Sequence, residues 1–175
     1  MWPWEHAVFG YVAYLAARPR ALVRADRYAI LAALAGSQFP DLIDKPLAWV
    51  FGVLPSGRSL AHSLFALAVV CTAVYAFFHV RRREVGLGFA VGYLTHLVGD
   101  AIGPALEGSY GELGFLLWPL TPAPAYDEPL GLHAVLSALA NATLGARFLL
   151  GVAVAAAVGT LLLVHFVRFA SWRAR

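Results

Sequence analysis

Long apolar runs, separated by short polar and basic segments, dominate the chain. A helix needs about 20 apolar residues to cross the hydrocarbon core of a bilayer. Runs of that length cover residues 60–80, 85–106 and 145–170, and two shorter runs cover residues 4–17 and 28–39. The pattern predicts an all-α protein, a polytopic transmembrane helix bundle of about five spans, in which the short runs pair, tilt or lie shallow.

Turn-forming residues concentrate in a polar stretch from about residue 107 to residue 143. Its proline, glycine and acidic residues predict an ordered extracytoplasmic loop region, with one short helix near residues 132–139. The chain has 175 residues, which suits one domain. We therefore expect a single integral membrane domain over residues 1–175.

The basic residues fall into three clusters, at residues 18–27, at residues 81–83 and at residues 168–175. Loops rich in arginine and lysine remain in the cytoplasm. With all three clusters on that side, the N-terminus is outside, the chain crosses five times and the C-terminus is inside. We expect a multi-pass protein of the inner (cytoplasmic) membrane.

Composition supports a lipid environment. The chain is 61% hydrophobic and 13% charged, whereas soluble proteins are about 25% charged. Its net charge of +3 comes from the loop clusters, so we expect contact with membrane lipid and not with nucleic acid. The single cysteine, Cys71, excludes an intrachain disulfide and a cysteine-based zinc site. The oligomeric state is left open.

Six ionisable side chains lie toward the outer ends of the predicted spans. Insertion of such a group into a membrane costs roughly 2.5–3.5 kcal/mol, so these groups usually serve a function. His96 and Asp100 are four residues apart and share one helix face. Imidazoles and carboxylates together suit zinc, manganese or iron. We expect a divalent metal, zinc above the others, to be bound by His6, Asp41, Asp44, His62, His96 and Asp100.

Two further features accompany this candidate metal site. Gly88, Gly92, Gly99 and Gly103 fall on much the same face of the fourth predicted span, which favours close approach of another helix. Arg58 precedes His62 by four residues at the outer surface, and its guanidinium suits a phosphate or carboxylate oxygen. We expect Arg58 and Ser63 to bind the substrate; lipid headgroups are the alternative partner of Arg58.

The order of motifs resembles a family of membrane-embedded metal-dependent hydrolases that includes a LexA-regulated bacterial inner-membrane protein. That family has a Gly-His pair, then Pro-Asp-x-Asp-x-Pro, His-Arg-x-x-Thr-His-Ser, Gly-Tyr-x-x-His-x-x-x-Asp and Leu-x-Trp-Pro. The corresponding segments here are 5–6, 40–46, 57–63, 92–100 and 116–119. Three departures are present: Glu5 replaces glycine, the two aspartates are three apart instead of two, and Gly57 replaces the first histidine of its motif.

The family is likened to the zinc-dependent phospholipase C group. The resemblance therefore implies hydrolysis of a phosphoester, in an amphiphilic or lipid-like substrate. On this hypothesis the six residues hold the metal, and Asp41 or Asp44 acts as general base. Two alternatives remain: a small membrane transporter, in which the same residues form an ion or proton path, and a non-enzymatic membrane scaffold or regulatory protein.

Overall fold

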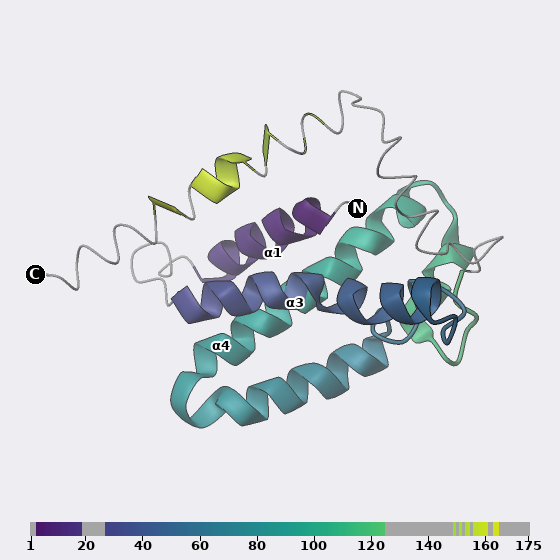
Figure 1. Ribbon diagram of the computed structural model, residues 1–175, viewed down its shortest axis with the longest axis horizontal. Helices are drawn as coiled ribbons and strands as arrows, with labels where there is room; N and C mark the ends of the chain where they lie inside the picture. Colours follow the sequence, from purple (N-terminus) through teal and green to yellow (C-terminus); the bar gives the residue numbers. More distant parts are fainter. Residues whose placement is uncertain are drawn as a thin grey trace, which may run out of the picture.

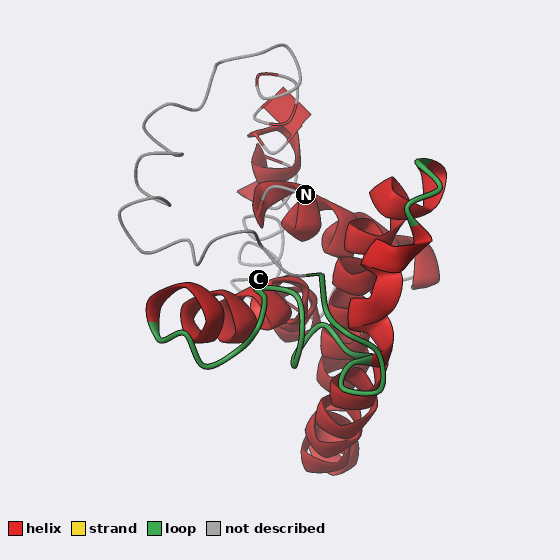
Figure 2. Cartoon of the chain, turned by 90° about the vertical axis from the view of Figure 1, so that its right-hand side faces the viewer, coloured by secondary structure: helices red, strands yellow, loops and turns green. Residues whose placement is uncertain are grey.

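The computed structural model describes residues 3–18 and 27–124, together with residues 149, 151, 153–154, 156–160 and 163–164. Every regular element within these residues is helical, and Figure 2 shows helices joined by loops. The predicted all-α class is therefore confirmed. The predicted helix at 132–139 and most of the predicted span at 145–170 lie outside the described residues.

Three helices make up the body of the structure. They are α1 (Pro3–Ala17), α3 (Arg27–Lys45) and the long α4 (Leu64–Leu106). A π-helical turn, η1 (Pro46–Val50), follows α3, and a 3-10 helix, η2 (Tyr110–Leu117), follows α4. In Figure 1 α1 and α3 lie side by side, and part of α4 crosses them.

Helix α4 consists of two helical halves. Arg82 has non-helical backbone angles (φ −150°, ψ 55°), and the chain reverses there, so that the halves form the hairpin seen in Figure 1. The halves correspond to the predicted spans 60–80 and 85–106, but the first begins four residues later than predicted. Ser63 is its N-cap, because the Ser63 hydroxyl accepts a hydrogen bond from the Ala66 amide.

Helix α3 is longer than the helix predicted from the apolar run at residues 28–39. It continues through Pro40, whose missing N–H leaves one backbone hydrogen bond unmade. Its buried positions recur every three or four residues, which places them on one stripe of the helix. They are Ala29, Ile30, Ala33, Gly36, Ser37, Pro40, Asp41 and Asp44. The polar end of this stripe points at the candidate site, and the apolar part packs with Tyr11 and Tyr14 of α1.

Glycines allow α3 and α4 to pack with their backbones in contact. A Cβ added at Gly88 would collide with the carbonyl of Ala29, and one at Gly92 with the carbonyl of Ala33. A Cβ added at Gly36 would likewise collide with the carbonyl of Phe89. The predicted glycine face is therefore used at Gly88 and Gly92, whereas nothing lies near Gly103.

Among the described residues, one helix, Arg82–Leu106, is long and apolar enough to cross a membrane. The apolar helix Leu64–His79 is shorter. Helices α1 and α3 match the two short predicted runs, and with 15 and 19 residues they lie near or below the length of a full crossing. The described residues thus contain one candidate span, and the five-span bundle stays a prediction.

Candidate metal centre

Six buried acidic and histidine side chains meet at one end of the helix bundle. They come from four separate segments: α1, the last turns of α3, the loop before α4, and the second half of α4. They are His6, Asp41, Asp44, His62, His96 and Asp100. The structure therefore brings together all six side chains that the sequence selected, although up to 94 residues separate them.

His96 is oriented by the backbone of α3. Its Nδ1 lies 2.6 Å from the carbonyl oxygen of Ser37, which can only accept, so Nδ1 donates. The other nitrogen, Nε2, is left facing the cluster, 3.1 Å from Nε2 of His62. Fixing of one imidazole nitrogen by a carbonyl, so that the other is free for a metal, is common at metal centres.

His62 is oriented by Asp44. Nδ1 of His62 lies 2.8 Å from Oδ2 of Asp44. The same carboxylate accepts backbone N–H bonds from Ser59 at 2.9 Å, from Ala61 at 2.8 Å and from His62 at 3.2 Å. Both oxygens of Asp44 are thereby engaged, and they fix the loop that carries His62.

The two carboxylate oxygens of Asp41 face different partners. Oδ2 is bonded to Lys45, one helical turn further along α3. Oδ1 lies 3.5 Å from Nε2 of His62 and 3.7 Å from Nε2 of His96. This oxygen is buried and has no hydrogen-bond partner, a condition that is costly unless a cation or donor occupies the space beside it.

Asp100 and His6 close the opposite side of the cluster. Oδ1 of Asp100 is 3.2 Å from Nε2 of His6, and Oδ2 is 3.6 Å from Nε2 of His62 and 3.9 Å from Nε2 of His96. The imidazole of His6 stacks on that of His96, with 3.8 Å between ring centroids. The predicted shared face of His96 and Asp100 is thus seen in the structure.

The spacing of these atoms fits a metal ion. Two ligands of a tetrahedral zinc, each about 2.0–2.1 Å from it, lie roughly 3.3 Å apart. The Nε2 atoms of His62 and His96 lie 3.1 Å apart. Each lies 3.5–3.9 Å from a carboxylate oxygen of Asp41 and from one of Asp100. Two sets of three residues have ligand atoms within 4.8 Å of one another, namely His6–His96–Asp100 and Asp41–His62–His96. The donor set is nitrogen and oxygen without thiolate, which suits zinc, manganese or iron.

The pKa of His62, in the loop before α4, also indicates that the cluster stabilises positive charge. Burial lowers the pKa of His62, but its contacts with Asp100, Asp41 and Asp44 outweigh burial and raise the pKa to about 10. The surrounding carboxylates therefore stabilise a cation at this point.

A cavity of about 780 Å³ adjoins the cluster. Asp100 and Arg58 both line it, so the cavity connects the cluster to the residue predicted to bind an anionic group. The remaining wall includes the apolar residues Val8, Phe9 and Ile102 and the acidic residues Glu5, Glu107 and Glu112. A volume of this size is typical of small-molecule sites.

Arg58 and Ser63, the two predicted substrate-binding residues, have different surroundings. The guanidinium of Arg58 lies over the ring of Phe115, 5.8 Å from its centroid. Ser63 is buried, and its hydroxyl donates to the Leu60 carbonyl while it accepts from Ala66. The structure gives Ser63 a helix-capping role and leaves its hydroxyl no further proton to donate.

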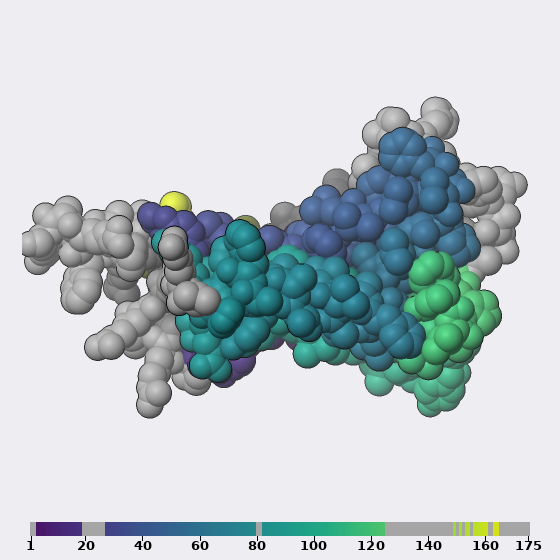
Figure 3. Space-filling view, turned by 90° about the horizontal axis from the view of Figure 1, so that it is seen from below, coloured from purple at the N-terminus to yellow at the C-terminus, as the bar shows by residue number. Residues whose placement is uncertain are grey.

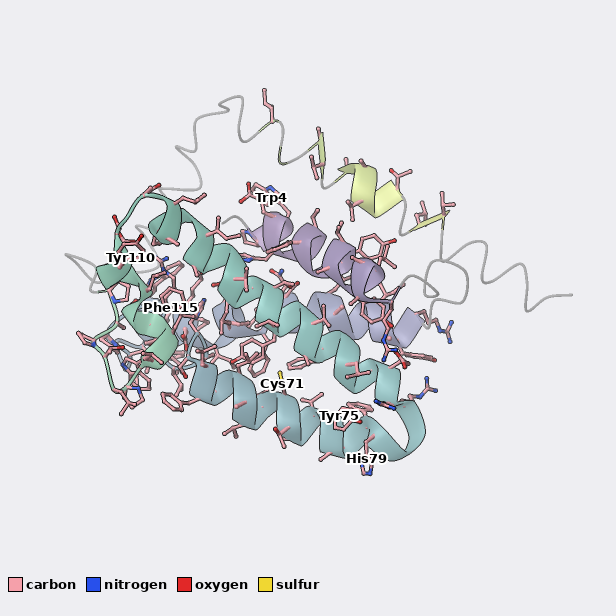
Figure 4. All side chains as sticks on the ribbon, turned by 180° about the vertical axis from the view of Figure 1, so that it is seen from behind. Trp4, Cys71, Tyr75, His79, Tyr110 and Phe115 are labelled. Atoms are coloured by element: carbon pink, nitrogen blue, oxygen red, sulfur yellow. The ribbon has the colours of Figure 1, made fainter. Side chains whose placement is uncertain are left out.

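Three residues of this end of the molecule were not selected from the sequence. Ser37 acts through its carbonyl, Lys45 pairs with Asp41, and Phe115 packs against His62 with 6.1 Å between ring centroids. Figure 3 shows the segment around η2 packed against the segment that follows α3, and Figure 4 shows Phe115 within this end of the structure. Only Lys45 carried a sequence signal, since it is one turn after Asp41 on the same helix face.

Of the histidines that the structure describes, His79 does not join the cluster. His79 is exposed, and Figure 4 places it with Tyr75 near the α4 hairpin, away from Phe115. His133 and His165 lie outside the described residues. At Gly57, where the resembled family has histidine, an added Cβ would lie 3.0–3.2 Å from the indole of Trp49. Trp49 therefore occupies the space that a side chain at Gly57 would enter.

Comparison with curated proteins and with solved structures finds no significant match to either. Residues 1–172, almost the whole chain, match the family described as YdjM inner membrane protein. This match covers the helices, the histidine and aspartate cluster and the cavity beside it. The chain therefore belongs to the YdjM inner membrane protein family.

Proposed function

We propose that this protein is a metal-dependent hydrolase whose site lies near the extracytoplasmic face of the inner membrane. The observation that carries the proposal is the convergence of imidazole and carboxylate atoms from four segments on one buried point beside a cavity. Buried charged groups of this density are costly in an apolar protein. A bound divalent cation offsets that cost.

The ligands are assigned by the atoms that face the centre of the cluster. Nε2 of His62, Nε2 of His96, Oδ1 of Asp41 and the carboxylate of Asp100 face the common point, with His6 beside Asp100. Asp44, whose oxygens are already bonded, holds His62 in place. A divalent ion held by these residues would lower the pKa of its bound water toward about 7 and polarise the bond under attack.

The acid–base role shifts from the aspartates of α3 to Asp100. Asp41 and Asp44 were expected to act as the base, but neither lines the cavity. Asp100 does, and it pairs with His6, whose Nδ1 is buried without a hydrogen bond. We propose that Asp100 takes the proton of the attacking water, that His6 stabilises the protonated Asp100, and that this proton then passes to the leaving oxygen as its bond to phosphorus breaks.

The cavity favours an amphiphilic phosphoester. Arg58 offers a guanidinium for phosphoryl oxygens and is held against Phe115. The apolar wall from α1 and α4 accepts a hydrocarbon portion. A substrate with a phosphate group at Arg58 and a hydrocarbon chain along the apolar wall would be lipid-like, and it would enter the cavity from the bilayer.

The arrangement of arginines supports the proposed topology of five spans with the N-terminus outside. Arg18 pairs with Glu84 at 3.2 Å, and Arg82 lies over the ring of Tyr28, 4.2 Å from its centroid. These residues belong to the ends of α1, α3 and the second half of α4 that lie away from the site. Between Arg82 and Asp100 the helix rises about 27 Å, close to the thickness of a membrane core.

Elemental analysis of the detergent-purified protein tests the proposal. We expect bound divalent metal in the parent and its loss in His62→Ala, His96→Ala and Asp100→Ala. His79→Ala, an exposed histidine outside the cluster, serves as the matched control and should retain the metal. A metal-free parent, or full metal content in all three cluster variants, would contradict a metal centre.

Activity is measured separately, with bis(p-nitrophenyl) phosphate and with vesicles that contain a chromogenic phosphodiester lipid. We expect hydrolysis by the parent and a loss of at least 100-fold in Asp100→Ala, which removes a ligand and the proposed base. A metal-loaded protein inert toward both probes would exclude phosphodiester hydrolysis as its activity.

A further inference from the structure

We infer that this centre holds a single divalent ion, and that the Lys45 ammonium occupies the position in which a second cation would bind. The inference rests on the proposed metal centre and concerns how many ions it takes. Two-metal hydrolytic sites hold their ions about 3.5–4 Å apart and need ligands for both. Three features of the structure support a single ion position at this centre.

The first feature is the sharing of His96. It belongs to both sets of ligand atoms, His6–His96–Asp100 and Asp41–His62–His96. Its Nδ1 donates to the Ser37 carbonyl, so Nε2 is its only ligand atom. An imidazole nitrogen has one lone pair in the ring plane and binds one ion. The two sets therefore describe one ion position.

The second feature is the state of the outer carboxylate oxygens. A carboxylate that bridges two ions must offer its second oxygen to the second ion. At Asp41 that oxygen, Oδ2, is bonded to the Lys45 ammonium. At Asp44 both oxygens are taken by the His62 ring and by backbone N–H groups. The bridging position on α3 is thus already filled by a positive charge of the protein itself.

The third feature is the way in which Lys45 is held. Its ammonium lies 5.5 Å from the ring centroid of Trp49, a distance at which cation and ring attract each other. Trp49 packs against Gly57, where any side chain would lie within 3.0–3.2 Å of the indole. Because Gly57 has no side chain, the indole of Trp49 fits beside it and contacts the Lys45 ammonium. The ammonium in turn binds Oδ2 of Asp41, so that only Oδ1 of Asp41 faces the ion.

A cobalt titration of metal-depleted protein measures the number of ions directly. Cobalt(II) bound to nitrogen and oxygen ligands absorbs in the visible range, so the end point gives the stoichiometry without any activity assay. We expect the absorbance to saturate at one equivalent per chain, with elemental analysis also giving one. Saturation at two equivalents would overturn the inference and leave the proposed hydrolase intact, whereas no binding at all would remove both.

The role of Lys45 is tested with two variants. Lys45→Ala removes the charge and frees Oδ2 of Asp41, so we expect a second, weaker equivalent of cobalt. Lys45→Arg keeps a cation beside Asp41 and should remain at one equivalent. A Lys45→Ala protein that folds, as judged by circular dichroism, and still saturates at one equivalent would refute the role of Lys45. If that variant does not fold, the stoichiometry of the parent still decides the single-ion inference.

Discussion

The position of His62 depends on Asp44, a residue that does not line the cavity beside the cluster. Asp44 lies at the end of α3 and accepts hydrogen bonds from the backbone N–H groups of Ser59, Ala61 and His62, as well as contacting the His62 ring. It therefore works as a clamp between two segments. Carboxylates that support metal-binding histidines in this way typically affect metal affinity by 10- to 100-fold.

Replacement of this clamp should weaken metal binding. In Asp44→Asn the amide carries no charge and can accept at one atom only, so some of the loop N–H groups lose their acceptor. We expect a divalent ion to bind about 10- to 100-fold more weakly, as measured by competition with a chromophoric chelator. Glu84→Gln, which changes an exposed ion pair with Arg18 near the α4 hairpin, is the control. Equal affinity in Asp44→Asn and the parent would show that the clamp is dispensable.

Ser63 provides a contrasting case at the same scale. As an N-cap, it should contribute about 1 kcal/mol to the stability of the first half of α4. We expect Ser63→Ala to lower the free energy of unfolding by that amount, with metal content and KM unchanged. A raised KM without loss of stability would instead support the substrate-binding role predicted from the sequence.

Single residues could be selected from the sequence, but their roles could not. An ionisable group in an apolar segment is costly, so it usually has a function, wherever it lies along the chain. This argument selected His6, Asp41, His62, His96 and Asp100. Whether an oxygen faces an ion or a backbone amide depends on the path of the loop from 51 to 63. No periodic pattern specifies that path.

At the scale of elements, the contact between α3 and α4 decides how close the ligands come to one another. The ligands of α3 and α4 meet because their backbones touch at Gly88 and Gly92. The glycine spacing predicted this face correctly for its first two members. It failed at Gly103, because α4 extends past the end of its contact with α3 and Gly103 borders the cavity instead.

A methyl group at Gly92 should separate the two helices. Its Cβ would meet the Ala33 carbonyl, a backbone atom that cannot turn away. We expect Gly92→Ala to cost about 1–3 kcal/mol of stability and to weaken metal binding, because the helices carry opposite sides of the centre. Unfolding in mixed detergent micelles and the chelator competition report the two effects.

Gly103→Ala is the matched control, since nothing lies within 4 Å of its added Cβ. It should be neutral, or stabilising by up to about 1 kcal/mol, because alanine favours a helix more than glycine does. If both substitutions had the same effect, the α3–α4 contact at Gly92 would not control stability.

At the scale of the whole molecule, the cluster lies at one end of the helices, and Arg18, Arg27 and Arg82 lie at the other. Each of α1, α3 and the second half of α4 has one end at the arginines and one at the cluster. The apolar runs and the positive-inside rule predicted that the ligands and these arginines lie at opposite ends of the spans; the side of the membrane that each end faces stays a prediction. They overestimated span lengths at the start of α4, because His62 and its neighbours form a loop there and not a turn of helix.

Thiol labelling of intact cells tests the polarity. In a Cys71→Ala background, Tyr110→Cys should react with an impermeant maleimide from outside, because Tyr110 is exposed at the cluster end. Arg83→Cys, at the arginine end, should react only after the membrane is permeabilised. Labelling of both positions from the same side would contradict the proposed orientation.

The reversal of α4 at Arg82 has a consequence for biosynthesis. His6 leaves the ribosome early, whereas His96 and Asp100 follow only after the chain has turned back at Arg82. A product that stops in the first half of α4 leaves the acidic and imidazole groups of α1 and α3 without their counterparts. Unpaired buried charges cost several kcal/mol each, so an incomplete chain carries a defect that membrane quality-control proteases can recognise.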